Sequence, residues 1–200
     1  MADGYEYDVF LSAASETPVG EWVDNHFLGM LRIHLGNEMP PERKPRVFWF
    51  KEQETGIHWQ ENLQKILTRS RILVSVLSPH YFRSEWCMAE FESMRKRETK
   101  LGMGSVEYPD GLIYPVLFSD GEYFEGVRRV AMVKDLSKWR YHWPQFRDSE
   151  KYLEFDKEMR TVGKELVQQI MKSPNWEKDF PVIMNPKTME EPVTKLPRIL

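Results

Sequence analysis

Cysteine is nearly absent from this sequence, because Cys87 is the only one among 200 residues. The chain therefore cannot close an internal disulfide, and it lacks the paired cysteines of common zinc motifs. It also lacks a large excess of either charge, since 28 basic residues stand against 31 acidic ones. A net charge of -3 does not create the positive field that attracts nucleic acid. We expect a reducing, cytoplasmic setting and no direct nucleic-acid partner.

Long apolar runs and metal-binding or nucleotide-binding motifs are missing as well. The uninterrupted apolar stretches are far shorter than the roughly 18 residues that a membrane-spanning helix needs. The first four residues lack the charged and apolar regions of a signal peptide. The five histidines show no His-x-x-x-His or His-Glu-x-x-His spacing, and no glycine-rich phosphate loop occurs. We therefore expect a soluble protein without a membrane span, a metal or a bound cofactor.

The residues that are present predict one domain in which strands and helices alternate. A chain of this length with 41% hydrophobic residues can bury one core. The predicted strands are residues 7–11, 46–50, 72–77, 112–118 and 131–136. The predicted helices are residues 22–35, 60–69, 84–97 and 149–171. Such alternation implies βαβ units, and we predict a flavodoxin-like α/β fold with a five-stranded parallel sheet in the order 2-1-3-4-5.

The last part of the sequence differs from the rest in composition. From Ser173 onward prolines recur without any helical or strand periodicity, at positions 174, 181, 186, 192 and 197. We predict a domain over residues 1–172 and a C-terminal extension or linker over residues 173–200. Such a linker suits a chain that continues into a further domain.

The predicted fold places several polar and aromatic residues at one edge of the sheet. In open parallel sheets ligands bind beyond the carboxyl ends of the strands, where the winding direction reverses, here between strands one and three. Strand one ends at Ser12, and the segment after strand three carries Tyr81, Ser84, Trp86, Cys87 and Glu90. Trp86 and Glu90 are four residues apart and share a helix face. The spacing alone favours an ordinary helix in which Trp86 packs, Cys87 fills the core and Glu90 is a surface charge.

Three separated stretches of the chain together resemble one family. They are Tyr7 to Ser12, the loop that ends at Gly56, and the stretch from Ser84 to Glu90. These stretches resemble the signature segments of TIR domains, and the similarity covers residues 5 to 170. The Trp-Cys-x-x-Glu element that ends at Glu90 is its most specific part. It is similar to the element of plant and bacterial TIR enzymes whose glutamate is required for NAD cleavage.

The resemblance implies an enzyme that cleaves the bond between nicotinamide and ribose. Glu90 is then the catalytic carboxylate, and NAD is the substrate. The products would be nicotinamide and ADP-ribose or a cyclic ADP-ribose isomer, in a bacterial antiphage defence. A single carboxylate suffices for this chemistry, because nicotinamide leaves as a neutral base and positive charge develops on the ribose.

The resemblance and the crevice together suggest which residues bind the substrate. We expect substrate contacts from Ser12, Ala13, Trp49, Phe50, Gly56, Ser84, Trp86 and Cys87. Trp49 or Trp86 would stack on a base of NAD, although tryptophans at such positions often simply pack in the core. The chain departs from the family at Ala13 and Ala14, where many TIR enzymes carry an arginine or histidine. It departs again at Phe48 to Phe50, where the family often has an aspartate.

A second hypothesis is a TIR scaffold without catalysis. In the family, the loop that corresponds to Lys51 to Trp59 contributes to head-to-tail assembly. Other TIR domains would then be the partners, together with a sensor domain or activator. The altered end of strand two and the missing cation after Ser12 favour this alternative. The two hypotheses differ at Glu90, because its replacement by glutamine would abolish turnover in the enzyme and leave assembly unchanged in the scaffold.

Overall fold

The computed structural model describes residues 4–52, 59–103, 111–119 and 133–183. Within these ranges the chain forms one five-stranded sheet in the order β2-β1-β3-β4-β5. All four strand pairs are parallel. The strands are β1 (Tyr7–Ser12), β2 (Val47–Phe48), β3 (Ser70–Leu77), β4 (Ile113–Leu117) and β5 (Lys134–Asp135). The predicted flavodoxin-like order is therefore confirmed.

The centre of the sheet is long and its edges are short. All eight residues of β3 are buried, as expected for a strand that is covered on both faces. The edge strands β2 and β5 have two residues each, fewer than the sequence pattern predicts. Residues 131–132 of the last predicted strand lie outside the described residues. Short edges leave few unpaired backbone groups for other chains to pair with.

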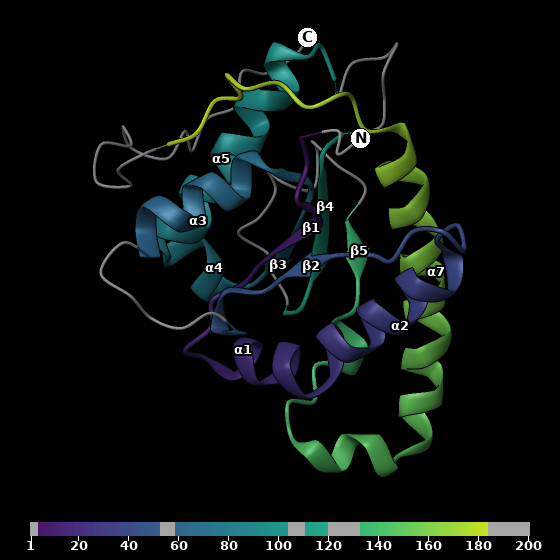
Figure 1. Cartoon of the computed structure of the whole chain (residues 1–200). Helices are drawn as coiled ribbons and strands as arrows, with labels where there is room; N and C mark the ends of the chain where they lie inside the picture. The colour runs from purple at the N-terminus through teal and green to yellow at the C-terminus, as the bar shows by residue number, and fades with distance from the viewer. Residues whose placement is uncertain (1–3, 53–58, 104–110, 120–132, 184–200) are drawn as a thin grey trace, which may run out of the picture.

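Helices cover both faces of the sheet (Figure 1). On one side lie α1 (Pro18–Trp22), α2 (Leu28–Glu38) and α7 (Glu150–Lys172). On the other side lie α3 (Trp59–Thr68), α4 (Pro79–Arg83) and α5 (Glu85–Lys100). Three short 3-10 turns are η2 (Phe50–Glu52), η3 (Ser137–Trp139) and η4 (Pro144–Asp148). The predicted helices over residues 84–97 and 149–171 are confirmed to within a few residues.

The first predicted helix is interrupted by a wider turn. Between α1 and α2 the chain forms a π-helical turn, η1 (Val23–Phe27), which accommodates an extra residue in the helix. Three side chains from this region bind backbone carbonyls of the segment between β5 and α7. The bonds run from Trp22 Nε1 to Trp139 (2.8 Å), from Asn25 Nδ2 to His142 (2.8 Å) and between His26 Nε2 and Trp143 (3.0 Å). The π turn therefore anchors the segment that leads into α7.

The helices α2 and α7 approach each other closely at Gly163. A Cβ atom at this position would lie 2.8 Å from the Cβ atom of His34, which is too close for any other residue without movement. His34 Nε2 also lies 2.8 Å from Asp156 Oδ1, so a polar contact ties the same two helices together. Glycine at 163 thus permits the packing that covers this face of the sheet.

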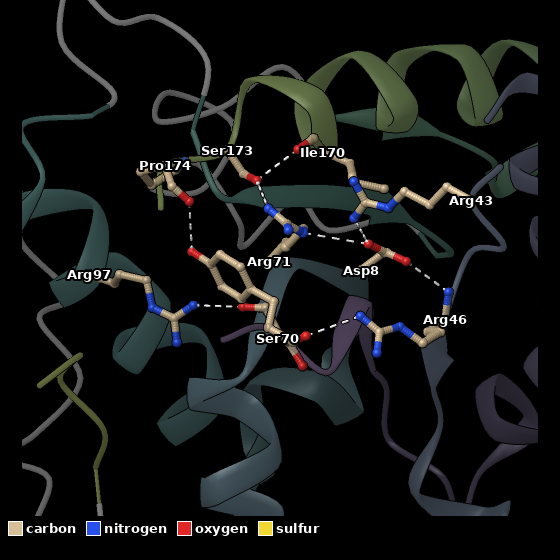
Figure 2. A network of polar contacts seen from close by, with 10 residues as sticks. Asp8, Arg43, Arg46, Ser70, Arg71, Arg97, Ile170, Ser173 and Pro174 are labelled. Atoms are coloured by element: carbon tan, nitrogen blue, oxygen red, sulfur yellow. Dashed lines mark hydrogen bonds and ion pairs between the residues drawn. The ribbon is translucent and has the colours of Figure 1, made fainter. Parts of the chain in front are cut away.

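A network of charged groups fills the amino end of the sheet (Figure 2). Asp8 on β1 is 0% exposed and forms an ion pair with Arg43. Its other carboxylate oxygen accepts a hydrogen bond from the backbone N–H of Arg46 at 2.9 Å. Arg71 Nε lies 3.5 Å from the first oxygen. A carboxylate can remain charged in the interior when cations and N–H groups surround it in this way.

Residues 173–183, which we call the C-terminal strap, pack against this amino end. Tyr5 donates a hydrogen bond to the carbonyl of Pro174 at 3.1 Å. Trp176 Nε1 donates to Thr68 at 3.1 Å, and Gln64 donates to the carbonyl of Ile183 at 3.1 Å. The sequence predicts an extension from residue 173 onward. The structure places its first part on the body of the domain, and residues 184–200 lie outside the described residues.

The buried Phe180 fixes the middle of the strap. The guanidinium carbon of Arg97 lies 4.3 Å from the centroid of the Phe180 ring. The same guanidinium donates to the carbonyls of Ser70 (2.7 Å) and Leu67 (3.0 Å). Arg97 therefore connects α5, the start of β3 and the strap.

The described ranges contain neither a membrane-spanning helix nor a cluster of metal-binding side chains. Across residues 4–52, 59–103, 111–119 and 133–183, no helix combines the length and the apolar composition that crossing a membrane requires. Within the same ranges, no three His, Cys, Asp or Glu side chains gather closely enough to hold a metal ion.

Candidate active site at the carboxyl end of the sheet

Two successive helix starts shape the carboxyl end of β3. Ser78 accepts a hydrogen bond from the backbone N–H of Tyr81 at 3.2 Å and caps α4, with Pro79 in its first turn. Ser84 accepts a hydrogen bond from the backbone N–H of Cys87 at 3.3 Å and caps α5. Two helices therefore begin in succession directly beyond the strand. As a result, Tyr81 and the first turns of α5 face the end of β1.

The end of β1 and the second turn of α5 meet through two side chains. The hydroxyl oxygen of Ser12 lies 2.5 Å from Oε2 of Glu90, although the two residues are 78 positions apart in the sequence. Ser12 is buried, whereas Glu90 is half-buried and retains an accessible side. Because β1 and β3 are neighbours, as predicted, these two predicted site residues lie in contact.

Tyr81 extends this contact into the interior. Its side chain is 0% exposed, and its hydroxyl oxygen lies 3.1 Å from the hydroxyl oxygen of Ser12. The Tyr81 hydroxyl also donates a hydrogen bond to the carbonyl of Cys87 at 3.2 Å. The carboxyl group of Glu90 thus lies at the accessible end of a line of hydroxyl groups from β1 and α4.

The surroundings of Glu90 change its acidity. Burial raises the pKa of Glu90 from its ordinary 4.5 to about 7, and the hydrogen bond with the Ser12 hydroxyl only partly opposes this shift. In the part of the chain that the structure describes, no cation forms an ion pair with this carboxyl group. A partly accessible carboxyl group that titrates near neutral pH is a typical feature of functional sites.

The other two titratable groups near Glu90 are neutral. Burial raises the pKa of Tyr81 well above its usual range, and burial raises the pKa of the Cys87 thiol to about 12. A thiol with so high a pKa is a poor nucleophile, because the thiolate is the reactive form. The chemistry of this crevice therefore centres on the carboxyl group of Glu90.

The predicted site residues near β2 are oriented differently. Trp49 is only 1% exposed, and its indole N–H donates to Oδ1 of Asp24 at 2.7 Å. Lys51 forms an ion pair with the other oxygen of Asp24 at 2.7 Å. Phe50 is half-buried and packs edge-on against the ring of Trp49, with their centroids 5.0 Å apart. This group is tied to the π turn, and stacking of Trp49 on a ligand would require the indole to move.

The remaining predicted residues lie on both sides of Glu90. Ala13 is buried directly after β1. On α5, the hydroxyl of Ser84 caps the helix, Cys87 is buried and Trp86 is half-buried. Gly56 lies outside the described residues. Trp86 is therefore the predicted aromatic residue of α5 with accessible surface close to Glu90.

Two residues that shape the site were not among the predicted site residues. The sequence predicts that Tyr81 lies near the end of β1, but no sequence pattern predicts its contact with Ser12, which is 69 positions away. The Ser-Pro pair that begins α4 is the signal that could have identified it, because it predicts a short capped helix. Asp24 carries no such signal, since its role depends on the π turn and on Trp49.

Comparisons with known proteins show which family the sequence matches and which solved structures it is similar to. The sequence matches the model of the TIR domain family over residues 6–182. Among solved structures, the chain is similar to the TIR domains in a structure described as the activated Roq1 resistosome directly recognizing the pathogen effector XopQ. The identity is 21%, the alignment covers 84% of this chain and 98% of that chain, and the TM-score is 0.37. A comparison with curated proteins returned no match.

Proposed function

The chain belongs to the TIR domain family, and from this premise we propose that it cleaves the nicotinamide–ribose bond of NAD with Glu90 as the catalytic carboxylate. The observation that supports the proposal is the contact between Glu90 Oε2 and the Ser12 hydroxyl at 2.5 Å, at the carboxyl end of the sheet. A half-buried carboxyl group with a pKa of about 7 is well suited to a reaction at neutral pH.

The reaction needs little from the protein beyond a well-placed negative charge. The bond between C1′ of the ribose and the pyridine nitrogen breaks, and both electrons leave with nicotinamide. Positive charge then develops on the ribose, and the carboxylate of Glu90 stabilises it. Water adds to C1′ and releases one proton, which yields ADP-ribose. An attack by an adenine nitrogen of the same molecule, in place of water, yields the cyclic isomer.

The neighbouring residues supply orientation and contact surface in this proposal. Ser12 holds the carboxylate, and Trp86 and Phe50 offer half-buried aromatic surface for a base. The backbone after β1, at Ala13 and Ala14, takes the place of the cation that many family members have there and contacts the phosphates through its N–H groups. Loss of NAD, or a nucleotide product, then serves as the signal in bacterial antiphage defence.

Self-association through the loop from Lys51 to Trp59 is the second part of this proposal. The structure describes the start of this loop, where the ion pair of Lys51 with Asp24 at 2.7 Å fixes the backbone beside the π turn. Residues 53–58 lie outside the described residues. Contacts between copies would bring a second chain to the accessible side of Glu90.

The experiment that tests catalysis compares nicotinamide release by the wild type and by Glu90→Gln. It is run at high protein concentration, with and without a crowding agent, so that weak self-association is not limiting. Glu92→Gln is the matched control, because Glu92 lies about half a turn further along α5 and forms an ion pair with Arg95 at 3.3 Å. We expect the wild type and the control to release nicotinamide and Glu90→Gln to lose activity by at least about 100-fold.

Two results would contradict the proposal. Turnover that persists in a folded Glu90→Gln protein would remove Glu90 from the mechanism. If no variant releases nicotinamide but all of them self-associate, the chain is a TIR scaffold. Analysis of the ribosyl product by chromatography separates hydrolysis from cyclisation in the active case.

A further inference from the structure

Three oxygen–oxygen contacts connect Glu90 to a backbone carbonyl. They run from Glu90 Oε2 to Ser12 Oγ (2.5 Å), from Ser12 Oγ to Tyr81 Oη (3.1 Å) and from Tyr81 Oη to the carbonyl oxygen of Cys87 (3.2 Å). Each contact needs one hydrogen to be a hydrogen bond. The two hydroxyl groups together supply only two hydrogens. The line is therefore one hydrogen short unless the carboxyl group provides it.

The carbonyl of Cys87 fixes the direction of every hydrogen in the line. A carbonyl can only accept, so Tyr81 must donate to it. The oxygen of Tyr81 must then accept from Ser12, because its single hydrogen is already used. Ser12 in turn can only accept from Glu90. All three hydrogen bonds exist together when Glu90 carries a proton.

The ionised form of Glu90 leaves one contact unsatisfied. A carboxylate has no hydrogen, so the Ser12 hydroxyl must rotate and donate to it. The Tyr81 hydrogen is then the only one left for the two remaining contacts, so one of them lacks a hydrogen bond. An unpaired polar contact away from water is costly, and therefore the Tyr81 hydroxyl favours the protonated acid, whereas the hydrogen bond from Ser12 favours the carboxylate.

We propose that Tyr81 is a positioning residue that acts through Ser12 to keep Glu90 protonated until the substrate binds, and that rotation of the Ser12 hydroxyl accompanies ionisation. The functional role of this arrangement rests on the proposed NAD cleavage, because the carboxylate is the form of Glu90 that stabilises the ribosyl cation. The positive nicotinamide ring supplies the charge that favours the carboxylate. The site thus becomes active when the cationic substrate arrives.

The groups that face Glu90 from the surrounding elements are consistent with this arrangement. They are Ser12 on β1, Tyr81 on α4 and Cys87 on α5 itself. Both titratable neighbours are neutral, because burial raises the pKa values of Tyr81 and Cys87. No cation of the described ranges interacts with the carboxyl group to oppose protonation. The hydroxyl line is therefore the main local influence besides burial.

The two hydroxyl groups have opposite effects, which makes the inference testable. Tyr81→Phe removes two hydrogen bonds from the protonated form, with Ser12 and with Cys87, but only one from the ionised form. Ser12→Ala removes the donor that stabilises the carboxylate. The first change should lower the pH at which Glu90 titrates, and the second should raise it. A purely structural disturbance would not separate the two variants in this way.

The experiment follows the side-chain carboxyl carbons of ¹³C-labelled glutamate by NMR as a function of pH. Glu90→Gln identifies the resonance of Glu90 by its disappearance. We expect a midpoint of about 7 in the wild type. The midpoint should shift by on the order of one pH unit downward in Tyr81→Phe and upward in Ser12→Ala, as expected when one hydrogen bond favours one form.

Tyr5→Phe is the matched control for the tyrosine change. Tyr5 is also buried and donates its hydroxyl hydrogen to a backbone carbonyl, that of Pro174 at 3.1 Å, but at the opposite end of the sheet. Its removal should leave the Glu90 midpoint unchanged. The inference is overturned if the midpoint in Tyr81→Phe equals the wild-type midpoint or rises. This outcome does not depend on activity, so it is distinguishable from a failure of the proposed NAD cleavage.

Discussion

The two ends of the central sheet each hold an acidic side chain that folding withdraws from water, and their surroundings differ sharply. Asp8 at the amino end has Arg43, Arg71 and the N–H of Arg46 around it (Figure 2). Glu90 at the carboxyl end has the hydroxyl of Ser12. Cations and N–H groups compensate the first charge, so it contributes to stability. The second charge is poorly compensated, which costs stability and leaves the group reactive.

The strongest test of this comparison removes the charge of Asp8. Asp8→Asn removes the negative charge beside the buried Arg71 and the half-buried Arg43. We expect the free energy of unfolding to fall by about 3–5 kcal/mol, the usual cost of breaking a buried ion pair. Urea denaturation at pH 7 measures this loss. Retained stability would show that the amino end does not depend on its charges.

The opposite change at the carboxyl end should stabilise the protein. The pKa of Glu90 is raised to about 7 on folding, so its contribution to stability is fully present below about pH 4.5 and is lost as the pH rises through 7. Glu90→Gln removes this loss. Above pH 7 we expect the variant to exceed the wild type by about 1–3 kcal/mol in free energy of unfolding.

Thermal or urea denaturation as a function of pH measures this difference. The difference should shrink toward zero as the pH approaches 4.5. Glu92→Gln, the control on the same helix, should change stability by less than about 0.5 kcal/mol at every pH, because exposed ion pairs contribute little. A Glu90→Gln protein that is less stable than the wild type at pH 8 would contradict the comparison.

The pH dependence of NAD cleavage tests whether the ionisation of Glu90 controls activity. If the carboxylate is the active form, activity should rise with pH and level off above about 7. Below that point it should fall by up to about tenfold per pH unit, which corresponds to about 1.4 kcal/mol. Initial rates at NAD concentrations well below KM, which report the titration of the free protein, measure this profile between pH 5 and 9. A flat profile would mean that Glu90 does not titrate in the active range.

The smallest expected effect concerns the hydroxyl of Tyr5. Tyr5→Phe removes one hydrogen bond between the amino end of the sheet and the C-terminal strap. We expect a loss of about 0.5–1.5 kcal/mol in free energy of unfolding and no change in the pH profile. The same two measurements, on the same preparation, separate stability from activity. If the pH profile of activity shifted in Tyr5→Phe, the two ends of the sheet would be coupled, and the comparison between them would fail.

The sequence alone predicts the sheet order and places Ser12 and Glu90 at the same end of the sheet. Alternating apolar segments and right-handed crossovers leave few possible topologies for a chain of this length. In such a sheet the carboxyl ends of strands one and three meet at a single edge. The role assigned to Glu90 came from the family resemblance, since the spacing of Trp86 and Glu90 also fits an ordinary surface helix.

The contacts that decide how the site works could not be predicted in the same way. Periodicity tells which face of a helix is buried, but it does not tell which atom a buried side chain contacts. The sequence therefore suggests Trp49 as a residue that stacks on a base, whereas in the structure its indole N–H donates a hydrogen bond to Asp24 in the π turn. The packing of the strap could not be predicted either. Its contacts at Tyr5, Trp176 and Phe180 are single contacts, which leave no periodic pattern in the sequence.

The strap also determines how the domain would respond to mechanical force. Its anchors are arranged in sequence, from Ile183 against Ser93 and Gln64, through Phe180 and Trp176, to Pro174 against Tyr5. A pulling force applied to the chain beyond residue 183 would break these contacts one after another, and only then would it act on α7 and the sheet. These contacts would therefore open before the sheet that carries Ser12 came under tension.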